Sequence, residues 1–121
     1  MVEDIYAIAT LAADIDERGH QYWLATIGDR DVGYVSAYFE GGRVWIKKLY
    51  VLSETRGSGL GKALIKTVVN RFGSELPIAL NVNDGNHAAI SFYKSQGFEV
   101  ERHVPVRMGP YDFHDFVMVK R

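Results

Sequence analysis

Three glycines at alternate positions form the part of this chain best suited to bind an anion. Gly57, Gly59 and Gly61 lie between a strand-like segment and the start of a helix-like one. Because glycine has no side chain, a ligand can approach the backbone closely, and the free amides at a helix start attract anions. The pattern therefore predicts a phosphate or pyrophosphate site over residues 57–62. A loop that merely turns the chain is the alternative interpretation.

The spacing of these glycines does not fit two familiar nucleotide loops. A Walker A loop has four residues between its outer glycine and Gly-Lys, whereas only three separate Gly57 from Gly61 here, and Ala63 stands where Ser or Thr is needed. A dinucleotide-binding fingerprint needs its third glycine where this chain has Lys62 or Leu64. A nucleotide-binding protein of another fold is therefore disfavoured.

Two segments together resemble the GNAT superfamily of N-acetyltransferases. Arg56-Gly57-Ser58-Gly59-Leu60-Gly61 satisfies that family's pyrophosphate-loop pattern, Arg/Gln-x-x-Gly-x-Gly/Ala. The stretch from Asn86 to Phe98 is similar to its second characteristic segment: Asn, an alanine three residues later, an aromatic residue before Tyr, then Gly-Phe. A hydrophobic strand ending in Tyr50-Val51, with Glu54 before the loop, also looks like the family. The resemblance spans roughly residues 22–119.

The resemblance implies acetyl-CoA as co-substrate and no metal. Amides of residues 57–62 would hold its pyrophosphate, and the strand around Leu49–Val51 would pair with its pantetheine arm. The strands at 43–52 and 77–82 would splay, so that the acyl thioester lies between them. The implied cofactor-binding residues are Leu49, Val51, Arg56, Gly57, Ser58, Gly59, Leu60, Gly61, Lys62 and Asn86.

Asn86 and Tyr93 each have a functional and a structural interpretation. By resemblance, Asn86 would hydrogen-bond the cofactor; it also suits a helix N-cap, and the two roles are compatible. Tyr93 matches the family's usual general acid, which protonates the departing thiolate, a reasonable role for a phenol of pKa about 10. The alternative for Tyr93 is an aromatic side chain packed beneath the sheet beside Phe92.

The implied function is transfer of an acetyl group from acetyl-CoA to a primary amine, of a small molecule or a peptide, by direct attack in a ternary complex. The general base is not identified. Many relatives carry a glutamate where this chain has Lys47-Lys48, a pair we expect to place one stem toward the core and one charge in solvent. Asn81, Asp84, His114 and Asp115 are candidates, directly or through water, as is an unassisted route. A non-catalytic acyl-CoA sensor or interaction domain is the alternative.

The elements expected from periodicity and turn residues form a single domain over residues 1–121. We expect an α/β (α+β) fold with a mixed, mostly antiparallel central sheet flanked by helices and a shortened N-terminal region. Spacings of three and four among Ile5, Ile8, Ala9 and Ala12 predict a helix over residues 2 to 17. Further helices are expected at 60–72 and 87–96, and strands at 22–27, 32–39, 43–52, 77–82, 98–106 and 115–119.

The composition of the chain excludes or disfavours several other classes of protein and of functional site. The chain has no cysteine, which excludes disulfides and thiolate nucleophiles, and its four histidines show no metal-ligand spacing, so most of them are expected at the surface or in caps. A net charge of −1 gives no reason to expect nucleic acid, and no apolar run is long enough for a membrane span. We expect a cytoplasmic protein. Because the region before Tyr22 is short for the family, we expect a homodimer in which the partner subunit completes the acceptor site.

Overall fold

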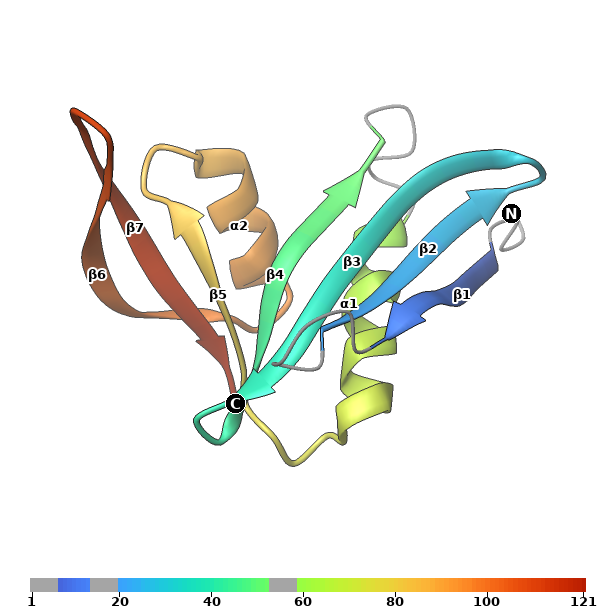
Figure 1. The fold of residues 1–121 in the computed structure, drawn as a ribbon. Helices are drawn as coiled ribbons and strands as arrows, with labels where there is room; N and C mark the ends of the chain where they lie inside the picture. The colour runs from blue at the N-terminus through green and yellow to red at the C-terminus, as the bar shows by residue number, and fades with distance from the viewer. Residues whose placement is uncertain (1–6, 14–19, 53–58) are drawn as a thin grey trace.

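The structure is a computed structural model that describes residues 7–13, 20–52 and 59–121. Its strands are β1 (Ala7–Ala13), β2 (Gln21–Ile27), β3 (Arg30–Glu40), β4 (Arg43–Val51), β5 (Ile78–Asn83), β6 (Glu99–Met108) and β7 (Tyr111–Lys120). The helices are α1 (Leu60–Phe72), between β4 and β5, and α2 (His87–Ser95), between β5 and β6. Figure 1 shows their arrangement.

The strands form one sheet in the order β1-β2-β3-β4-β5-β7-β6. All neighbouring pairs are antiparallel except β4 and β5, which are parallel. The parallel pair requires a crossover, and α1 supplies it. The expected mixed, mostly antiparallel sheet is therefore confirmed.

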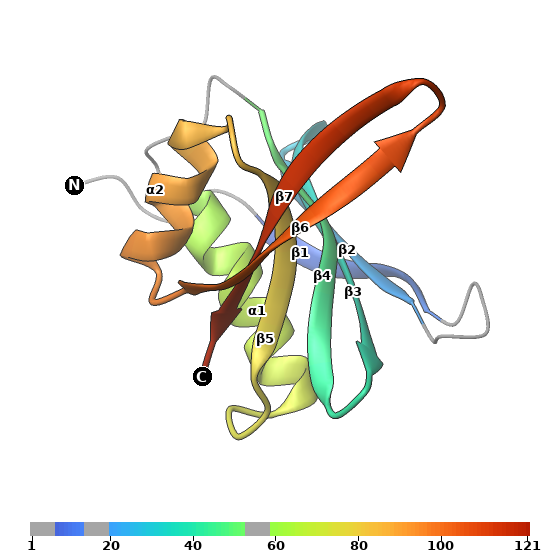
Figure 2. The same ribbon diagram turned by 90° about the vertical axis from the view of Figure 1, so that its left-hand side faces the viewer.

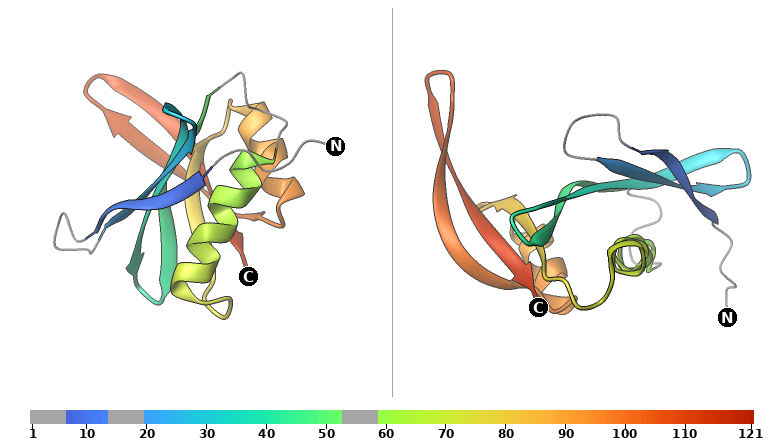
Figure 3. Two further views of the ribbon diagram at one scale, coloured as in Figure 1. Left: turned by 90° about the vertical axis from the view of Figure 1, so that its right-hand side faces the viewer. Right: turned by 60° about the horizontal axis from the view of Figure 1, so that its bottom comes forward.

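Both helices lie on the same face of this sheet (Figures 2 and 3). Leu60, Leu64 and Val68 of α1, each four residues apart, are buried against the sheet and create the helix's apolar stripe. Gly33 permits this close contact, because a Cβ there would lie 2.8 Å from the carbonyl oxygen of Tyr50 and 3.3 Å from a Leu60 methyl group. Burial of this stripe fixes the start of α1, where the ligand site was expected.

The expected helix over residues 2 to 17 is wrong for residues 7–13, which form β1. β1 pairs antiparallel with β2, from Ala7 opposite Thr26 to Ala13 opposite Gln21. Alanine-rich sequence favours a helix locally, but this segment instead satisfies the hydrogen-bonding groups along the outer edge of β2. A first strand is thus present before the β2–β3 hairpin, in the region for which the sequence predicted a helix.

The last two strands are longer than expected. β6 and β7 form a hairpin of ten residues on each side, in which Met108 is paired with Tyr111, so most of the expected loop is strand. The expectation that most histidines lie at the surface is confirmed by His87, His103 and His114, which are exposed, whereas His20 is buried beside Tyr38, with ring centroids 4.5 Å apart. No helix in the described ranges has the length and apolar character that a membrane crossing requires.

Candidate active site

β4 and β5 separate after a short paired stretch. Their parallel register joins Val44 to Ile78, Trp45 to Ala79 and Ile46 to Leu80, and goes no further. Beyond it β4 continues along β3 to Val51, and β5 continues along β7 to Asn83. The facing edges of both strands therefore carry backbone groups without a ladder partner across the opening. This is the divergence that the family resemblance implied for the two strands (Figure 1).

A β-bulge lies at the point of separation. Ser36 is opposite Lys48 whereas Ala37 is opposite Ile46, so Lys47 is an extra residue in β4. A bulge breaks the alternation of side chains and bends the strand. Both lysine side chains are consequently exposed, and the expectation that one of them would point toward the core is wrong.

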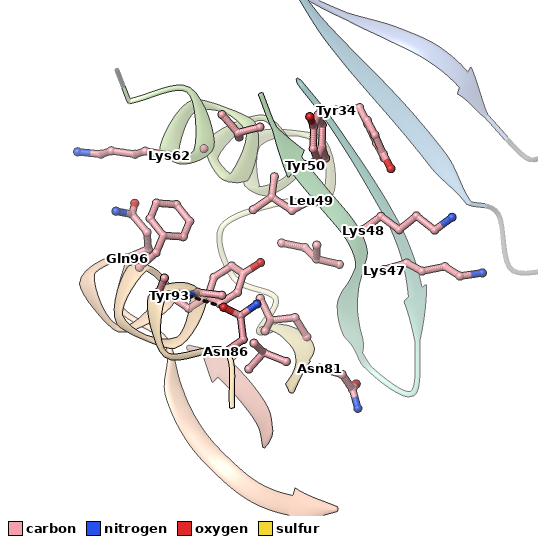
Figure 4. A pocket seen from close by; sticks show the side chains of 18 of the residues that line it. Tyr34, Lys47, Lys48, Leu49, Tyr50, Lys62, Asn81, Asn86, Tyr93 and Gln96 are labelled. Carbon is pink, nitrogen blue, oxygen red and sulfur yellow. Dashed lines mark hydrogen bonds between the residues drawn. The ribbon is translucent and has the colours of Figure 1, made fainter. Parts of the chain in front are cut away.

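A cavity of about 860 Å³ fills the space between the diverging strands and the helices; we call it the inter-strand pocket. Figure 4 shows the side chains that surround it. Its lining from the sheet is Tyr34, Ile46, Lys47, Lys48, Leu49, Tyr50, Val51, Leu80, Asn81, Val82 and Asn83. Its lining from the helices and their starts is Gly59, Gly61, Lys62, Asn86, Ala88, Ala89, Phe92, Tyr93 and Gln96. The pocket thus brings together most of the described residues that the sequence nominated.

The start of α1 presents free backbone amides beside this pocket. Gly59 adopts a left-handed conformation with φ 88°, and its carbonyl accepts the first helical hydrogen bond, from the amide of Ala63 at 3.0 Å. The amides of residues 60–62 precede that bond, and no side chain caps them in the described residues. Together with the helix dipole they form an anion site.

The individual loop residues contribute differently to this anion site. Gly59, Gly61 and Lys62 line the pocket, whereas the Leu60 side chain is 1% exposed and packs in the core, so Leu60 can offer only its amide. The predictions for Arg56, Gly57 and Ser58 concern residues outside those that the structure describes.

Asn86 caps α2, and none of the described residues accepts a hydrogen bond from its side-chain NH₂ group. Its side-chain oxygen accepts a hydrogen bond from the Ala89 amide at 3.2 Å, which confirms the N-cap interpretation. An N-cap uses only the oxygen of the side-chain amide. The NH₂ group remains available to a ligand in the inter-strand pocket, which Asn86 lines.

Tyr93 reaches the pocket from α2, with its hydroxyl directed toward β4 (Figure 4). Its ring is half-buried and packs edge-on against Phe98, with centroids 5.6 Å apart, and beside Phe92 at 5.4 Å. Burial raises the pKa of Tyr93 above its usual value of 10.0, so the phenol keeps its proton at neutral pH. A protonated hydroxyl in this position can donate to a developing anion.

Of the base candidates, only Asn81 lines the pocket, and an amide cannot accept a proton at neutral pH. Asp84 is instead bound to His103, with Oδ2 and Nε2 3.0 Å apart. His114 lies beside His103 in a tilted arrangement, with ring centroids 5.2 Å apart. Neither Asp84, His114 nor Asp115 belongs to the lining.

Several lining residues were not foreseen from the sequence. Tyr34 enters the wall because the β3–β4 register places it opposite Tyr50, with ring centroids 5.8 Å apart. Gln96 follows three residues after Tyr93 and four after Phe92, a helical spacing that could have identified it. No cluster of three or more histidine and carboxylate side chains suited to a metal is found in the described parts of the chain.

Comparison with known proteins identifies similar chains. Residues 18–100 match the model of the acetyltransferase (GNAT) domain. An uncharacterized N-acetyltransferase of Methanocaldococcus jannaschii is 33% identical over 87 residues, covering 69% of this chain and 56% of its own. Another, from Mycobacterium tuberculosis, is 33% identical over 79 residues, covering 64% and 51%. The chain therefore spans about half the length of these curated relatives.

Solved structures agree in fold. Naa50 of Arabidopsis thaliana, in complex with the bisubstrate analogue CoA-Ac-MVNAL, is 32% identical with a TM-score of 0.68, covering 83% of this chain and 72% of its own. A GNAT family acetyltransferase of Elizabethkingia anophelis with acetyl-CoA bound has a TM-score of 0.75 over 98% of this chain and 99% of its own, at 14% identity. The separation of β4 from β5 and the helix that begins after Gly59 are consistent with these comparisons. The match to the domain model shows that this chain belongs to the GNAT acetyltransferase family.

Proposed function

We propose that this chain is an N-acetyltransferase that moves the acetyl group of acetyl-CoA to a primary amine, of a small molecule or a peptide. The observation that carries the proposal is the inter-strand pocket, which joins the free amides at the start of α1 to the gap between β4 and β5. Family membership and the names of the relatives support it. The bisubstrate analogue bound to the Arabidopsis relative, which combines CoA, acetyl and a peptide, supports a ternary complex.

In this proposal the cofactor lies along the pocket. Its pyrophosphate binds the amides of residues 60–62, together with Arg56, Gly57 and Ser58 of the glycine loop, and the charge of Lys62 adds to the attraction. The two amide groups of the pantetheine arm pair with the open edge of β4 around Leu49 and Val51. The NH₂ group of Asn86 donates to the arm from the other side.

The acetyl thioester then lies between the separated strands, within reach of Tyr93. The neutral amine nitrogen of the acceptor attacks the thioester carbonyl carbon, and a C–N bond forms. The tetrahedral intermediate collapses with cleavage of the C–S bond, and the Tyr93 hydroxyl gives its proton to the departing thiolate. The proton of the amine passes to water, and solvent reprotonates Tyr93. No covalent enzyme intermediate is needed.

The test is release of free coenzyme A thiol during turnover with a panel of amines. The chain has no cysteine, so the protein adds no thiol background to the assay. Thiol release that requires both acetyl-CoA and an amine, with an N-acetylated product by mass spectrometry, is the expected result. Acetyl-CoA binding without transfer to any amine would reject the enzymatic proposal.

A non-catalytic acyl-CoA-binding domain is the second candidate. One observation favours it: no Asp or Glu is among the described residues that line the pocket, so none of those residues supplies a carboxylate base. The turnover assay separates the two candidates.

The cytoplasmic location and the homodimer stay predictions from the sequence. Sedimentation of the purified chain measures whether it is a homodimer.

A further inference from the structure

The inter-strand pocket carries positive charge at both ends. Lys62 is at the end formed by the start of α1, beside Gly59 and Gly61. Lys47 and Lys48 are at the other end, where the pocket reaches the sheet face that no described helix covers (Figures 2 and 4). In Figure 4 the Lys62 side chain and the Lys47–Lys48 pair point away from each other on opposite sides of the pocket. The first end suits the cofactor phosphates, so the second is left for the acceptor.

The bulge in β4 creates the second charged end. In a regular strand two successive lysines would point to opposite faces. Because Lys47 is the extra residue between the Ser36–Lys48 and Ala37–Ile46 pairs, both side chains are exposed at the pocket. Two adjacent cations therefore stand where the strands separate, which is where the proposed function places the reacting carbonyl.

Neither lysine is neutralised by the described residues. No hydrogen bond or ion pair joins Lys47 or Lys48 to them, and the described lining contains no Asp or Glu. Two carboxylates of the β6–β7 hairpin have other partners: Glu101 binds Arg43 and Arg121, and Asp112 lies 3.5 Å from Arg107. The positive potential at this end is left for a ligand to balance.

Neutral side chains complete the same end of the pocket. Asn81 is exposed on β5 and points away from α2, toward the side of the lysines (Figure 4). Tyr34 and Tyr50 form a tilted aromatic pair with ring centroids 5.8 Å apart. An amide that donates and accepts, two cations and an aromatic wall suit a polar anion with an apolar portion, and they repel a polycation.

We propose that Lys47 and Lys48 select acceptors that carry an anionic group close to the reacting amine. A free amino acid supplies that group as its α-carboxylate, and a peptide supplies it as an acidic side chain next to its N-terminus. The inference rests on the proposed acetyl transfer and names the substrate class of the same site. Polyamines and basic peptides are the disfavoured class.

The test compares matched acceptors in the thiol-release assay. Each amino acid is measured against its uncharged carboxamide, and short peptides with Asp as second residue are measured against those with Asn or Lys there. The expected kcat/KM is about tenfold higher for the anionic member of a pair, and the difference shrinks at high salt, because screening weakens exposed charges. If only the amino-acid series shows the preference for an anionic acceptor, the acceptor is a free amino acid. If only the peptide series shows it, the acceptor is a peptide.

Variants assign the preference to the lysines. The ratio of kcat/KM between anionic and neutral acceptors should fall about threefold in Lys47→Gln or Lys48→Gln and approach one in the double variant. Lys48→Glu should turn the preference toward peptides with Lys as second residue. Lys66→Gln, at an exposed position of α1 outside the pocket lining, is the matched control and should keep the wild-type ratio. A thermal melt of each variant verifies folding.

The two levels of the proposal fail differently. Equal kcat/KM for charged and neutral acceptors, a preference for basic ones, or an anionic preference that survives in the folded double variant would overturn the inference and leave acetyl transfer standing. Acetyl-CoA binding without transfer to any acceptor would overturn the proposed function, and the inference with it.

Discussion

Phe92 of α2 lies directly over Gly61 of α1. A Cβ built on Gly61 would be 2.9 Å from Cζ of Phe92, closer than such atoms approach in proteins. Both residues also line the inter-strand pocket. The last glycine of the loop therefore allows helix packing as well as ligand approach, and the pattern that predicts a cofactor loop also encodes the contact that holds α2 against α1.

Gly61→Ala should destabilise the chain by about 1–3 kcal/mol, because the added methyl group overpacks the contact with Phe92. Alanine is the better helix former by up to ~1 kcal/mol, which offsets part of this loss. Urea unfolding of Gly61→Ala, Phe92→Leu and the double variant measures the coupling. In the Phe92→Leu background the alanine should become neutral or stabilising. An equal loss in both backgrounds would show that Phe92 is not the cause.

Substitutions of Asn86 separate its cap from its role toward the cofactor. Asn86→Ala loses the bond from the Ala89 amide and should cost about 0.5–2 kcal/mol of stability. Asn86→Asp keeps an acceptor for that amide at a helix N-terminus, so its stability should stay near wild type. It lacks the NH₂ donor, and its acetyl-CoA affinity should fall roughly fivefold to tenfold. An unchanged affinity of Asn86→Asp for acetyl-CoA would show that Asn86 only caps α2 and does not bind the cofactor.

Tyr93→Phe should lower kcat at least about tenfold while changing the acetyl-CoA dissociation constant less than about twofold, because the thiolate loses its proton donor. The phenylalanine keeps the edge-on packing against Phe98, so folding should persist. Tyr22→Phe, at a half-buried position of β2 outside the pocket, is the control. Wild-type turnover in Tyr93→Phe would remove Tyr93 from the mechanism.

Glu101 makes stability depend on pH at the acid end. The Arg43 guanidinium donates to both carboxylate oxygens at 3.0 and 3.1 Å and, with Arg121, holds the pKa of Glu101 at about 2, below its usual 4.5. The lowered pKa favours the folded state above the unfolded value and loses this effect as pH falls from 4.5 toward 2. Glu101→Gln should therefore have a lower melting temperature than wild type at pH 7. The difference in melting temperature should disappear as the pH falls from 4.5 to 2.

The control for this measurement is Glu99→Gln, an exposed glutamate two positions earlier in β6. It should follow the wild-type melting temperature at each pH. A constant gap between wild type and Glu101→Gln from pH 7 down to pH 2 would contradict the titration of Glu101 as its origin.

Short-range sequence patterns predicted the two helices and their ends, because these features depend mainly on residues close together in the sequence. The four-residue spacing of Leu60, Leu64 and Val68 placed α1 at the observed residues, and the glycines around it marked its start. Asn86 and Gly97 likewise bounded α2, with Gly97 at φ 95°. The same glycines and Tyr93 were enough to nominate one wall of the pocket.

Features that depend on distant pairing could not be read from the sequence. The alanines of β1 suit a helix as well as a strand, and only the partner edge of β2 decides between them. The bulge at Lys47 comes from its register with β3, so simple alternation assigned one lysine to the wrong face. Tyr34 reached the pocket through the same register, which no local spacing reports.

Calorimetric titration of the full chain with acetyl-CoA, with ATP and NAD as controls, tests the central claim most directly. Saturable binding of one acetyl-CoA per chain, with no comparable heat from ATP or NAD, is the predicted result. Folded protein that binds neither acetyl-CoA, coenzyme A nor a longer acyl-CoA would contradict the account. The glycines at the start of α1 would then serve only the packing of the helices.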